Sequence, residues 1–281
     1  MKKILIIGTL FFSISILGQE KLDPDKYYAE SKTIFIESEV YKKQRELQIF
    51  VPDEYAWEKN KKFKVLYLFD AQNARIFNYI SGSIQLLSMN TIDPVIIVGV
   101  VTEDRWDEFL PPNNHKETLE RYEPPIGHSD KLIEHIENEI EPYIKENYRT
   151  QDYRLAIGHS LGATFVTYAS MKTENLFDYN ILLSPNYNYD KKQFVNRYKK
   201  FVKTDLLKKK KFYFINGYGD EYEEEFDEAL QDVIKILENS KNKKICWNYK
   251  KLDINNHGLI WLGVYNALMA WWKWIQPNAS S

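Results

Sequence analysis

Residues 153–171 read YRLAIGHSLGATFVTYASM, and this stretch decides the fold. The segment Tyr153–Ile157 alternates and is rich in large apolar residues, which is typical of a buried strand. After Ser160, apolar residues return at steps of three and four, which predicts a helix. Between them lies GHSLG at residues 158–162, a Gly-x-Ser-x-Gly motif. This motif predicts a sharp strand-to-helix turn that presents a nucleophilic serine above the edge of a sheet.

The glycines that end the motif have a steric reason. A side chain at Gly158 or Gly162 would collide across the tight turn that exposes the serine oxygen. The bare pattern is expected by chance in roughly one in ten chains of this length, so an ordinary glycine-flanked turn with a surface serine is the alternative. The strand pattern before the motif and the helix pattern after it favour the nucleophile.

Strands and helices alternate along the rest of the chain. Residues 33–39 and 45–51 are predicted to form an antiparallel hairpin. Residues 64–69 and 95–101 are nearly continuous apolar runs, as in strands buried on both faces. Further patterns predict strands at residues 154–158, 180–183, 212–216 and 245–250, and helices from Ser129 and over residues 222–237. The fold class is therefore α/β, with a mostly parallel sheet of about eight strands and helices on both faces. Ligands bind beyond the carboxyl ends of such strands, where Ser160 falls.

The 281 residues carry no linker, repeat or low-complexity tract, which predicts one domain over residues 19–281. Residues 1–18 resemble a cleavable signal peptide, because two lysines precede the apolar run Ile4–Leu17 and a small residue, Gly18, ends it. We therefore expect a secreted or periplasmic protein. An uncleaved signal anchor is the alternative.

Charge and composition limit the partners. The chain has 38 basic and 40 acidic residues, so no nucleic-acid footprint is expected, and the lysine run at residues 208–211 is interpreted as a solvated face.

Residues 258–275 are apolar and rich in tryptophan, but polar residues interrupt them; a buried terminal helix is favoured over a membrane anchor. We expect no stable membrane span in the mature chain. No histidine and carboxylate cluster has zinc spacing, so neither a metal nor another cofactor is expected. The oligomeric state is left open.

A serine nucleophile needs a base and an acid that orients the base. In this motif's context the partners follow the serine in the order acid, then histidine. His257 is the only histidine after Ser160, and it lies in a polar loop after the last strand. Asp220 is the first carboxylate after the strand at residues 212–216 and is the predicted acid. Alternatives among its neighbours stay open, namely Glu221, Glu224 and Asp227.

The developing oxyanion needs two backbone N–H donors. One is expected from Leu161, the residue after the nucleophile. The second is expected from the loop after the strand at residues 64–69, where Ala71 and Gln72 are both candidates.

Five segments resemble the putative esterase family of the α/β-hydrolase superfamily: VLYLFDAQN, VIIVGVVTEDRWDEFLPP, YRTQDYRLAIGHSLGA, LLSPNYNY and NHGLIWLGVYNAL. The family includes siderophore, feruloyl and acetylxylan esterases, esterase D and mycolyltransferases, and the similarity runs from about Ile34 to Trp272. The resemblance implies Ser160 as nucleophile, His257 as base, Asp220 as acid, and Gln72 as the second oxyanion donor. Two departures from many relatives are Gly162-Ala163 and Asp70-Ala71, where alanine replaces glycine.

Two further interpretations concern the mouth of the site. Arg105 could contact an anionic or phenolic substrate, but a structural ion pair is favoured. Tyr187 and Tyr189 could line the cleft, although plain packing is the default for tyrosines.

The expected function is that of a secreted serine hydrolase, which cleaves a small-molecule or carbohydrate ester through an acyl-enzyme on Ser160. An acyltransferase on the same fold and a non-catalytic binding protein on this scaffold are the alternatives. Substrate choice is expected to reside in the loops.

Overall fold

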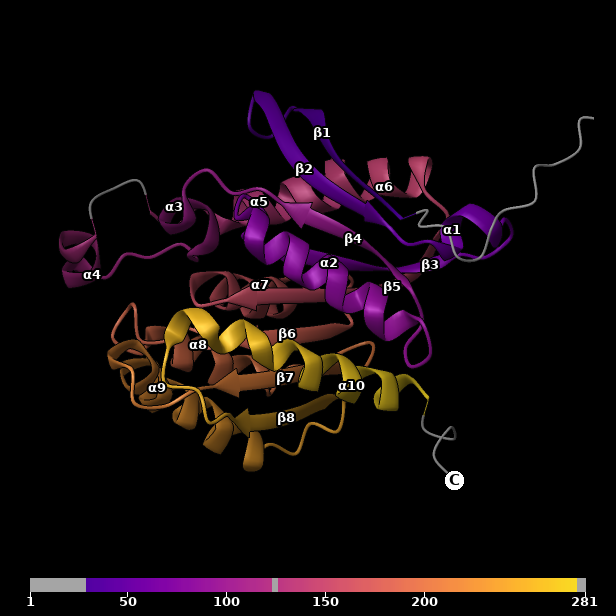
Figure 1. Ribbon diagram of the computed structural model, residues 1–281. Coiled ribbons are helices and arrows are strands. Elements are labelled where there is room, and N and C mark those ends of the chain that lie inside the picture. Colours follow the sequence, from indigo (N-terminus) through magenta and orange to yellow (C-terminus); the bar gives the residue numbers. More distant parts are fainter. Residues whose placement is uncertain (1–28, 123–125, 277–281) are drawn as a thin grey trace, which may run out of the picture.

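The computed structural model describes residues 29–122 and 126–276, so the predicted signal peptide at residues 1–18 lies outside the described residues. Eight strands form one sheet in the order β1-β2-β4-β3-β5-β6-β7-β8 (Figure 1). The strands are β1 Glu30–Ser38, β2 Lys43–Val51, β3 Phe63–Phe69, β4 Val95–Val100, β5 Thr150–His159, β6 Tyr179–Leu183, β7 Lys210–Asn216 and β8 Ile245–Lys251. β2 is antiparallel to β1 and β4, and the other neighbouring pairs are parallel. The predicted α/β fold with about eight strands is confirmed.

Helices cover both faces of the sheet. They are α1 Glu54–Trp57, α2 Ala74–Ser88, α3 Arg105–Phe109, α4 Lys116–Arg121, α5 Ser129–His135, α6 Glu141–Asn147, α7 Leu161–Lys172, α8 Gln193–Phe201, α9 Glu221–Glu238 and α10 Val264–Ile275, with a π-helical turn η1 Ile136–Ile140 and a 3₁₀ helix η2 His257–Gly263. α2 and α10 lie on one face (Figure 1), where their apolar side chains pack in one core cluster with η2. The other face is covered by α5, η1, α6, α7, α8 and α9, whose apolar residues form the second cluster.

Two helices depart from the simple patterns. The helix predicted from Ser129 contains the π turn η1, which directly precedes α6. Pro142 lies in the first turn of α6 and has no N–H to donate, so an uninterrupted α-helical ladder cannot pass through it. The terminal apolar stretch begins as η2 before it becomes α10, and Trp271 on α10 is fully buried against the sheet. The terminal helix is thus buried, as predicted.

The connections open a crevice at the carboxyl ends of β3 and β5. These two strands are neighbours, but β3 leads into α2 on one face and β5 leads into α7 on the other. At such a point the loops that follow the two strands run to opposite faces of the sheet. The space between these loops is where α/β folds bind ligands. Within residues 29–122 and 126–276, no helix is long and apolar enough to cross a membrane.

A substitution at the strand end tests the steric argument. A Cβ at Gly158 would lie 2.3 Å from the carbonyl oxygen of Gly162. Because this clash is with backbone, we expect Gly158→Ala to lower the free energy of unfolding by about 3 kcal/mol or more. Urea-induced unfolding measures the change.

Gly82, inside α2, supplies the matched control, since a Cβ there meets no atom within 4 Å. We expect Gly82→Ala to raise the free energy of unfolding by about 0.5–1 kcal/mol, because alanine loses less backbone entropy in a helix. A similar loss of stability in both variants would contradict the steric account of Gly158.

Candidate active site

Ser160 occupies the turn between β5 and α7 in a strained conformation. Its φ is 55° and its ψ is −119°, outside the regions that side-chain-bearing residues usually adopt. The turn is held from both sides: the Ser160 N–H donates to the carbonyl of Leu183 at 2.9 Å, and the Ser160 carbonyl accepts from the N–H of Thr164 at 3.1 Å. The predicted strand, turn and helix are confirmed.

The second glycine of the motif brings the β3 loop close to this turn. A Cβ at Gly162 would lie 3.1 Å from Oδ2 of Asp70, the residue that follows β3. The motif and the loop that carries Gln72 therefore meet at the same edge of the sheet.

His257 is the first residue of η2, and its ring is held by a buried carboxylate. The Nδ1 atom of His257 lies 2.6 Å from Oε1 of Glu223, in the first turn of α9. Glu223 is 1% exposed, and its other oxygen accepts from Ser184 Oγ at 2.8 Å and from the N–H of Gly217 at 2.5 Å. Three hydrogen-bond donors compensate this buried carboxylate for the loss of contact with water. It favours the imidazole tautomer with the proton on Nδ1, which leaves Nε2 free to accept a proton.

Asp220, the predicted acid, lies elsewhere. It is the N-cap of α9: one oxygen accepts from the N–H of Tyr222 at 2.9 Å, and the other accepts from the backbone N–H of His257 at 3.2 Å. Desolvation acts to raise the pKa of Asp220, but these two N–H groups, together with the nearby His257 ring and the N–H of Glu223, lower that pKa below its ordinary value. The expected contact between the Asp220 carboxylate and the histidine ring is therefore wrong, because an N-cap side chain turns toward the first N–H groups of its own helix.

Glu223 was missed, although the sequence carries a signal for it. Glu223 lies three and seven residues before Phe226 and Leu230, and all three are buried on α9. A carboxylate on the apolar stripe of a helix must be paired, since an isolated buried charge is costly. The alternatives Glu221 and Glu224 lie off this stripe, and Asp227 bonds to Asn216, Gln231, Tyr249 and Lys251.

His159 packs directly against the ring of His257, with centroids 4.3 Å apart, and against Trp261 at 5.4 Å. Desolvation by burial, with the nearby charges of His257 and Arg105, lowers the pKa of His159 well below its ordinary value. Its Nε2 atom is buried and has no hydrogen-bond partner in the described part of the chain. His159 is therefore a neutral wall of the site.

The two predicted oxyanion donors lie on adjoining loops. Leu161 is the first residue of α7, and its N–H has no partner inside the helix. In the β3 loop, the N–H groups of Ala71 and Asn73 are bonded to carbonyls, whereas that of Gln72 has no partner among residues 29–122 and 126–276. The Gln72 side chain fixes this loop, since its Oε1 accepts from the N–H of Thr102 at 3.2 Å.

Arg105 forms a structural ion pair, as favoured. Its Nε lies 2.6 Å and its second guanidinium nitrogen 3.1 Å from the oxygens of Asp70, and it also donates to the carbonyl of His159 at 3.3 Å. Burial raises the pKa of Asp70 despite the opposing charge of Arg105. Tyr187 and Tyr189 are fully buried, so packing is their role, not lining of the cleft.

Two cavities flank this group and share the side chains of Arg105 and His159. The first, about 350 Å³, is lined by Ser160, Leu161 and His257 together with aromatic and charged side chains, namely Trp106, Arg121, Tyr122, Tyr222, Glu225 and Phe226. The second, about 1020 Å³, lies between the start of α2 and η2 and is bordered by Gln72. Ser160 and His257 thus face one cavity, and Gln72 faces its neighbour.

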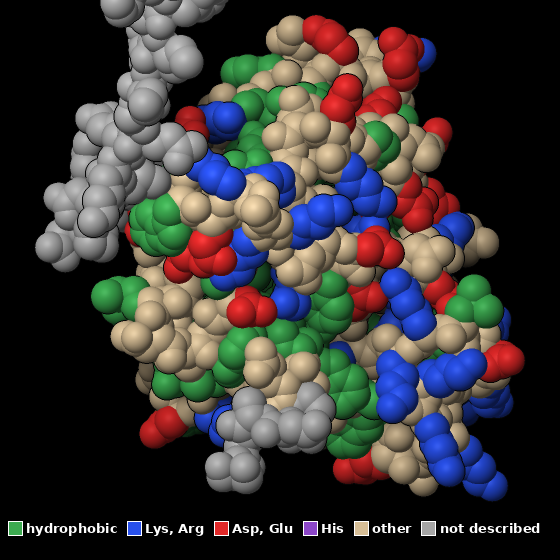
Figure 2. Space-filling view, turned by 90° about the vertical axis from the view of Figure 1, so that its right-hand side faces the viewer, with side chains coloured by type: hydrophobic (Ala, Val, Ile, Leu, Met, Phe, Trp, Pro, Cys, Tyr) green, Lys and Arg blue, Asp and Glu red, His purple; other side chains and the backbone are tan. Residues whose placement is uncertain are grey.

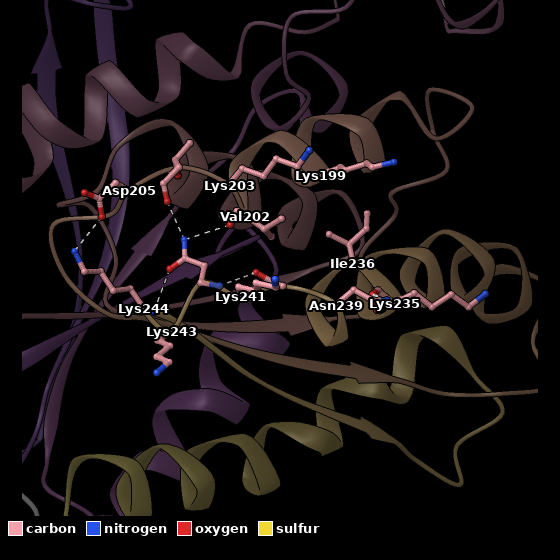
Figure 3. A pocket seen from close by; sticks show the side chains of 13 residues that line it. Lys199, Val202, Lys203, Asp205, Lys235, Ile236, Asn239, Lys241, Lys243 and Lys244 are labelled. Carbon is pink, nitrogen blue, oxygen red and sulfur yellow. Dashed lines mark hydrogen bonds and ion pairs between the residues drawn. The ribbon is translucent and has the colours of Figure 1, made fainter.

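A third hollow, of about 880 Å³, shares no residue with this group (Figure 3). It lies between the ends of α8 and α9 and the loop before β8, and six of its thirteen lining residues are lysines. The face of the molecule shown in Figure 2 also carries many lysine and arginine side chains at its lower right. In Figure 3 the side chains of Lys199 and Lys235 extend toward the right of the view, and that of Lys243 points away from them at the lower left. Within the described ranges, no group of three or more histidine, cysteine or acidic side chains could hold a metal ion.

The family model described as Putative esterase matches residues 38–272. The chain belongs to this esterase family. As a member, it is a carboxylic ester hydrolase. A search of curated proteins gave no match.

Similar solved structures agree with the fold of this esterase. An IroE-like serine hydrolase from Shewanella oneidensis has a TM-score of 0.76 at 22% identity, over 87% of this chain and 80% of that one. The siderophore hydrolase EstB from Aspergillus nidulans has a TM-score of 0.67 at 14% identity, over 86% and 95%. The enterobactin esterase FES from Shigella flexneri has a TM-score of 0.65 at 18% identity, over 88% and 59%. The esterase has the α/β-hydrolase fold that these structures share.

The neutral state of His159 predicts a pH dependence of stability. The unfolded esterase binds a proton at this residue near pH 6.5, whereas the folded one does so only at much lower pH. Protons therefore favour unfolding, and this contribution to the free energy of unfolding is lost as pH falls below about 6.5. We expect His159→Gln to flatten the dependence measured by urea unfolding between about pH 7.5 and 5.5.

His115→Gln is the matched control, because the side chain of His115, at the N-cap of α4, contacts the uncharged hydroxyl of Thr118 and no carboxylate among the described residues. It should leave the pH dependence close to that of the wild type. An unchanged slope in His159→Gln would contradict the burial of a neutral ring at position 159.

Proposed function

We propose that this esterase acts through an acyl-enzyme on Ser160, with His257 as general base and Glu223 as the acid that orients it. The observation that carries the proposal is the 2.6 Å contact between Nδ1 of His257 and the buried Glu223 carboxylate. Ser160, in its strained turn, lines the same cavity as His257. A nucleophile, a base and a buried acid in this order suffice for acyl transfer.

The reaction follows from these positions. His257 Nε2 takes the proton of Ser160 as Oγ attacks the ester carbonyl, and the imidazolium formed is stabilised by Glu223. The N–H groups of Leu161 and Gln72 are the donors for the negative oxygen. Collapse of the tetrahedral intermediate releases the alcohol, which takes its proton from His257. Water, deprotonated by the same histidine, then attacks the acyl-enzyme and releases the carboxylic acid.

Asp220 is assigned a positioning role. Its oxygen accepts the backbone N–H of His257, so it fixes where η2 begins without touching the ring. Glu223 bonds simultaneously to the end of β6, the end of β7 and the base, through Ser184, Gly217 and His257.

Two further observations support the substrate class and the location of the esterase. The similar structures include siderophore hydrolases and an enterobactin esterase, which supports a small-molecule ester as substrate. The signal-peptide pattern at residues 1–18 supports export of the esterase, to the periplasm or the medium.

Substitutions of the two carboxylates separate their roles. We expect Ser160→Ala to lower kcat about 10⁶-fold and Glu223→Gln about 10⁴-fold, because the amide removes the charge that stabilises the imidazolium. Asp220→Asn should cost less than about tenfold, since the amide oxygen still accepts from one of the two N–H groups and Asp220 does not contact the histidine ring. Hydrolysis of p-nitrophenyl acetate by the purified variants measures these values.

Fluorophosphonate labelling of the wild type should modify Ser160 and should fail in Ser160→Ala. A greater loss of kcat in Asp220→Asn than in Glu223→Gln would contradict the assignment of the acid. Labelling of other residues but not of Ser160 would rule out Ser160 as the nucleophile.

A further inference from the structure

The larger cavity beside Ser160 has an apolar wall on the helix that carries the base. Leu259 and Leu262 of η2 line this cavity, yet 54% and 51% of their surface is exposed. Residues three apart eclipse one another in a 3₁₀ helix, so the two leucines form one continuous stripe. Ile260 and Trp261, between them, are buried against the sheet.

This wall is held firmly relative to His257. Asn256 caps η2, since its side chain accepts the N–H of Leu259 at 3.2 Å. At the other end, a Cβ on Gly263 would lie 2.7 Å from Leu252 and 3.0 Å from Ile215, so η2 sits directly on the sheet. The leucines follow the base by two and five residues and cannot move independently of it.

The opposite wall comes from the start of α2, which lies on the same face of the sheet as α10 (Figure 1). Ile76 and Tyr79 line the cavity from this side, and Arg75 is at its exposed rim. The charged groups deeper inside, Asp70 and Arg105, are bonded to each other. The chamber therefore presents mainly apolar surface, and about 1020 Å³ is within the range that encloses a small ligand.

The chemistry of the proposed reaction decides which part of the ester enters the larger chamber. The leaving alcohol must take its proton from His257, which lines the smaller cavity with Ser160. The carbonyl oxygen must point to the Gln72 N–H, and Gln72 lines the larger chamber. With the alcohol on the histidine side and the carbonyl oxygen on the N–H groups of Leu161 and Gln72, the acyl chain is the remaining substituent of the carbonyl carbon, and the neighbouring chamber is the space left for it.

We propose that the chamber between α2 and η2 binds an extended apolar acyl group, with Leu259 and Leu262 as its specificity-determining residues. This inference rests on the proposed function, since it needs the acyl-enzyme on Ser160. Continuity with the site through the shared side chains of Arg105 and His159 supports the substrate as the occupant. Burial of the two exposed leucines against an alkyl chain is favourable in proportion to the apolar area removed from water.

Two isomeric esters test the inference: ethyl octanoate, with its alkyl chain on the acyl side, and octyl acetate, with its chain on the alcohol side. We expect the wild type to prefer ethyl octanoate in kcat/KM, measured by pH-stat titration. The double variant Leu259→Ser, Leu262→Ser should lower the ratio of kcat/KM for ethyl octanoate to kcat/KM for p-nitrophenyl acetate at least about tenfold. Leu86→Ser is the matched control, because Leu86 is 70% exposed on α2 and lines none of the cavities described above.

If the double variant retained the ethyl octanoate rate, the assignment of the chamber as the acyl site would be overturned. An equal loss in Leu86→Ser would overturn it as well. A loss on octyl acetate alone would overturn the acyl assignment. The proposed function has its own readout. If Ser160→Ala still hydrolysed p-nitrophenyl acetate, the assignment of Ser160 as nucleophile would be wrong, whatever the result for the leucine variants.

Discussion

The backbone of Ser160 is the constraint on which the site depends. The residue bears a side chain at a φ of 55°, and it holds this conformation because the chain on either side leaves no room for another path. The backbone of Gly162 comes so close to Gly158 that a methyl group would not fit between them. The same closeness packs α7 against the loop after β3 and aims the serine at the crevice between β3 and β5.

Around this turn, one buried carboxylate joins the separate strand ends into a site. Glu223 receives hydrogen bonds from Ser184 after β6, from Gly217 after β7 and from His257 after β8. Each donor comes from a different loop, so the carboxylate orders three connections at once. Removing one partner from such a network leaves buried polar groups unpaired, which costs more than the single bond contributes. Stability and positioning of the base are therefore coupled at this residue.

The two sides of the crevice around Ser160 differ in polarity. On one side, aromatic rings and charged groups surround the cavity of His257, with Trp106 stacked on Tyr122 at 4.2 Å. On the other side, leucines of η2 face the start of α2. Because η2 carries both the proposed base and the leucines, the two proposed roles fall on one element.

Much of this arrangement could be predicted from the sequence. The apolar runs of β3, β4 and β5 and the glycines around Ser160 identified the sheet and the turn, since strand period and steric exclusion act between near neighbours. His257 could be singled out because no other histidine follows Ser160. Asp220 was chosen by its place at a strand end, yet its side chain caps α9, and the ring contact comes from Glu223 in the first turn of the same helix.

The sequence by itself determined the α/β fold, the strand, turn and helix around Ser160, and the choice of His257 as candidate base, because these depend on local periodicity, on residue size and on chain order. Only the tertiary structure decided that Glu223 meets the ring and that Leu259 and Leu262 border a chamber. Those relations depend on the angle at which α9 and η2 pack on the sheet. Asp220 is the N-cap of α9 and Glu223 lies in its first turn, and only the packed helix shows that Glu223 is the one that meets the ring.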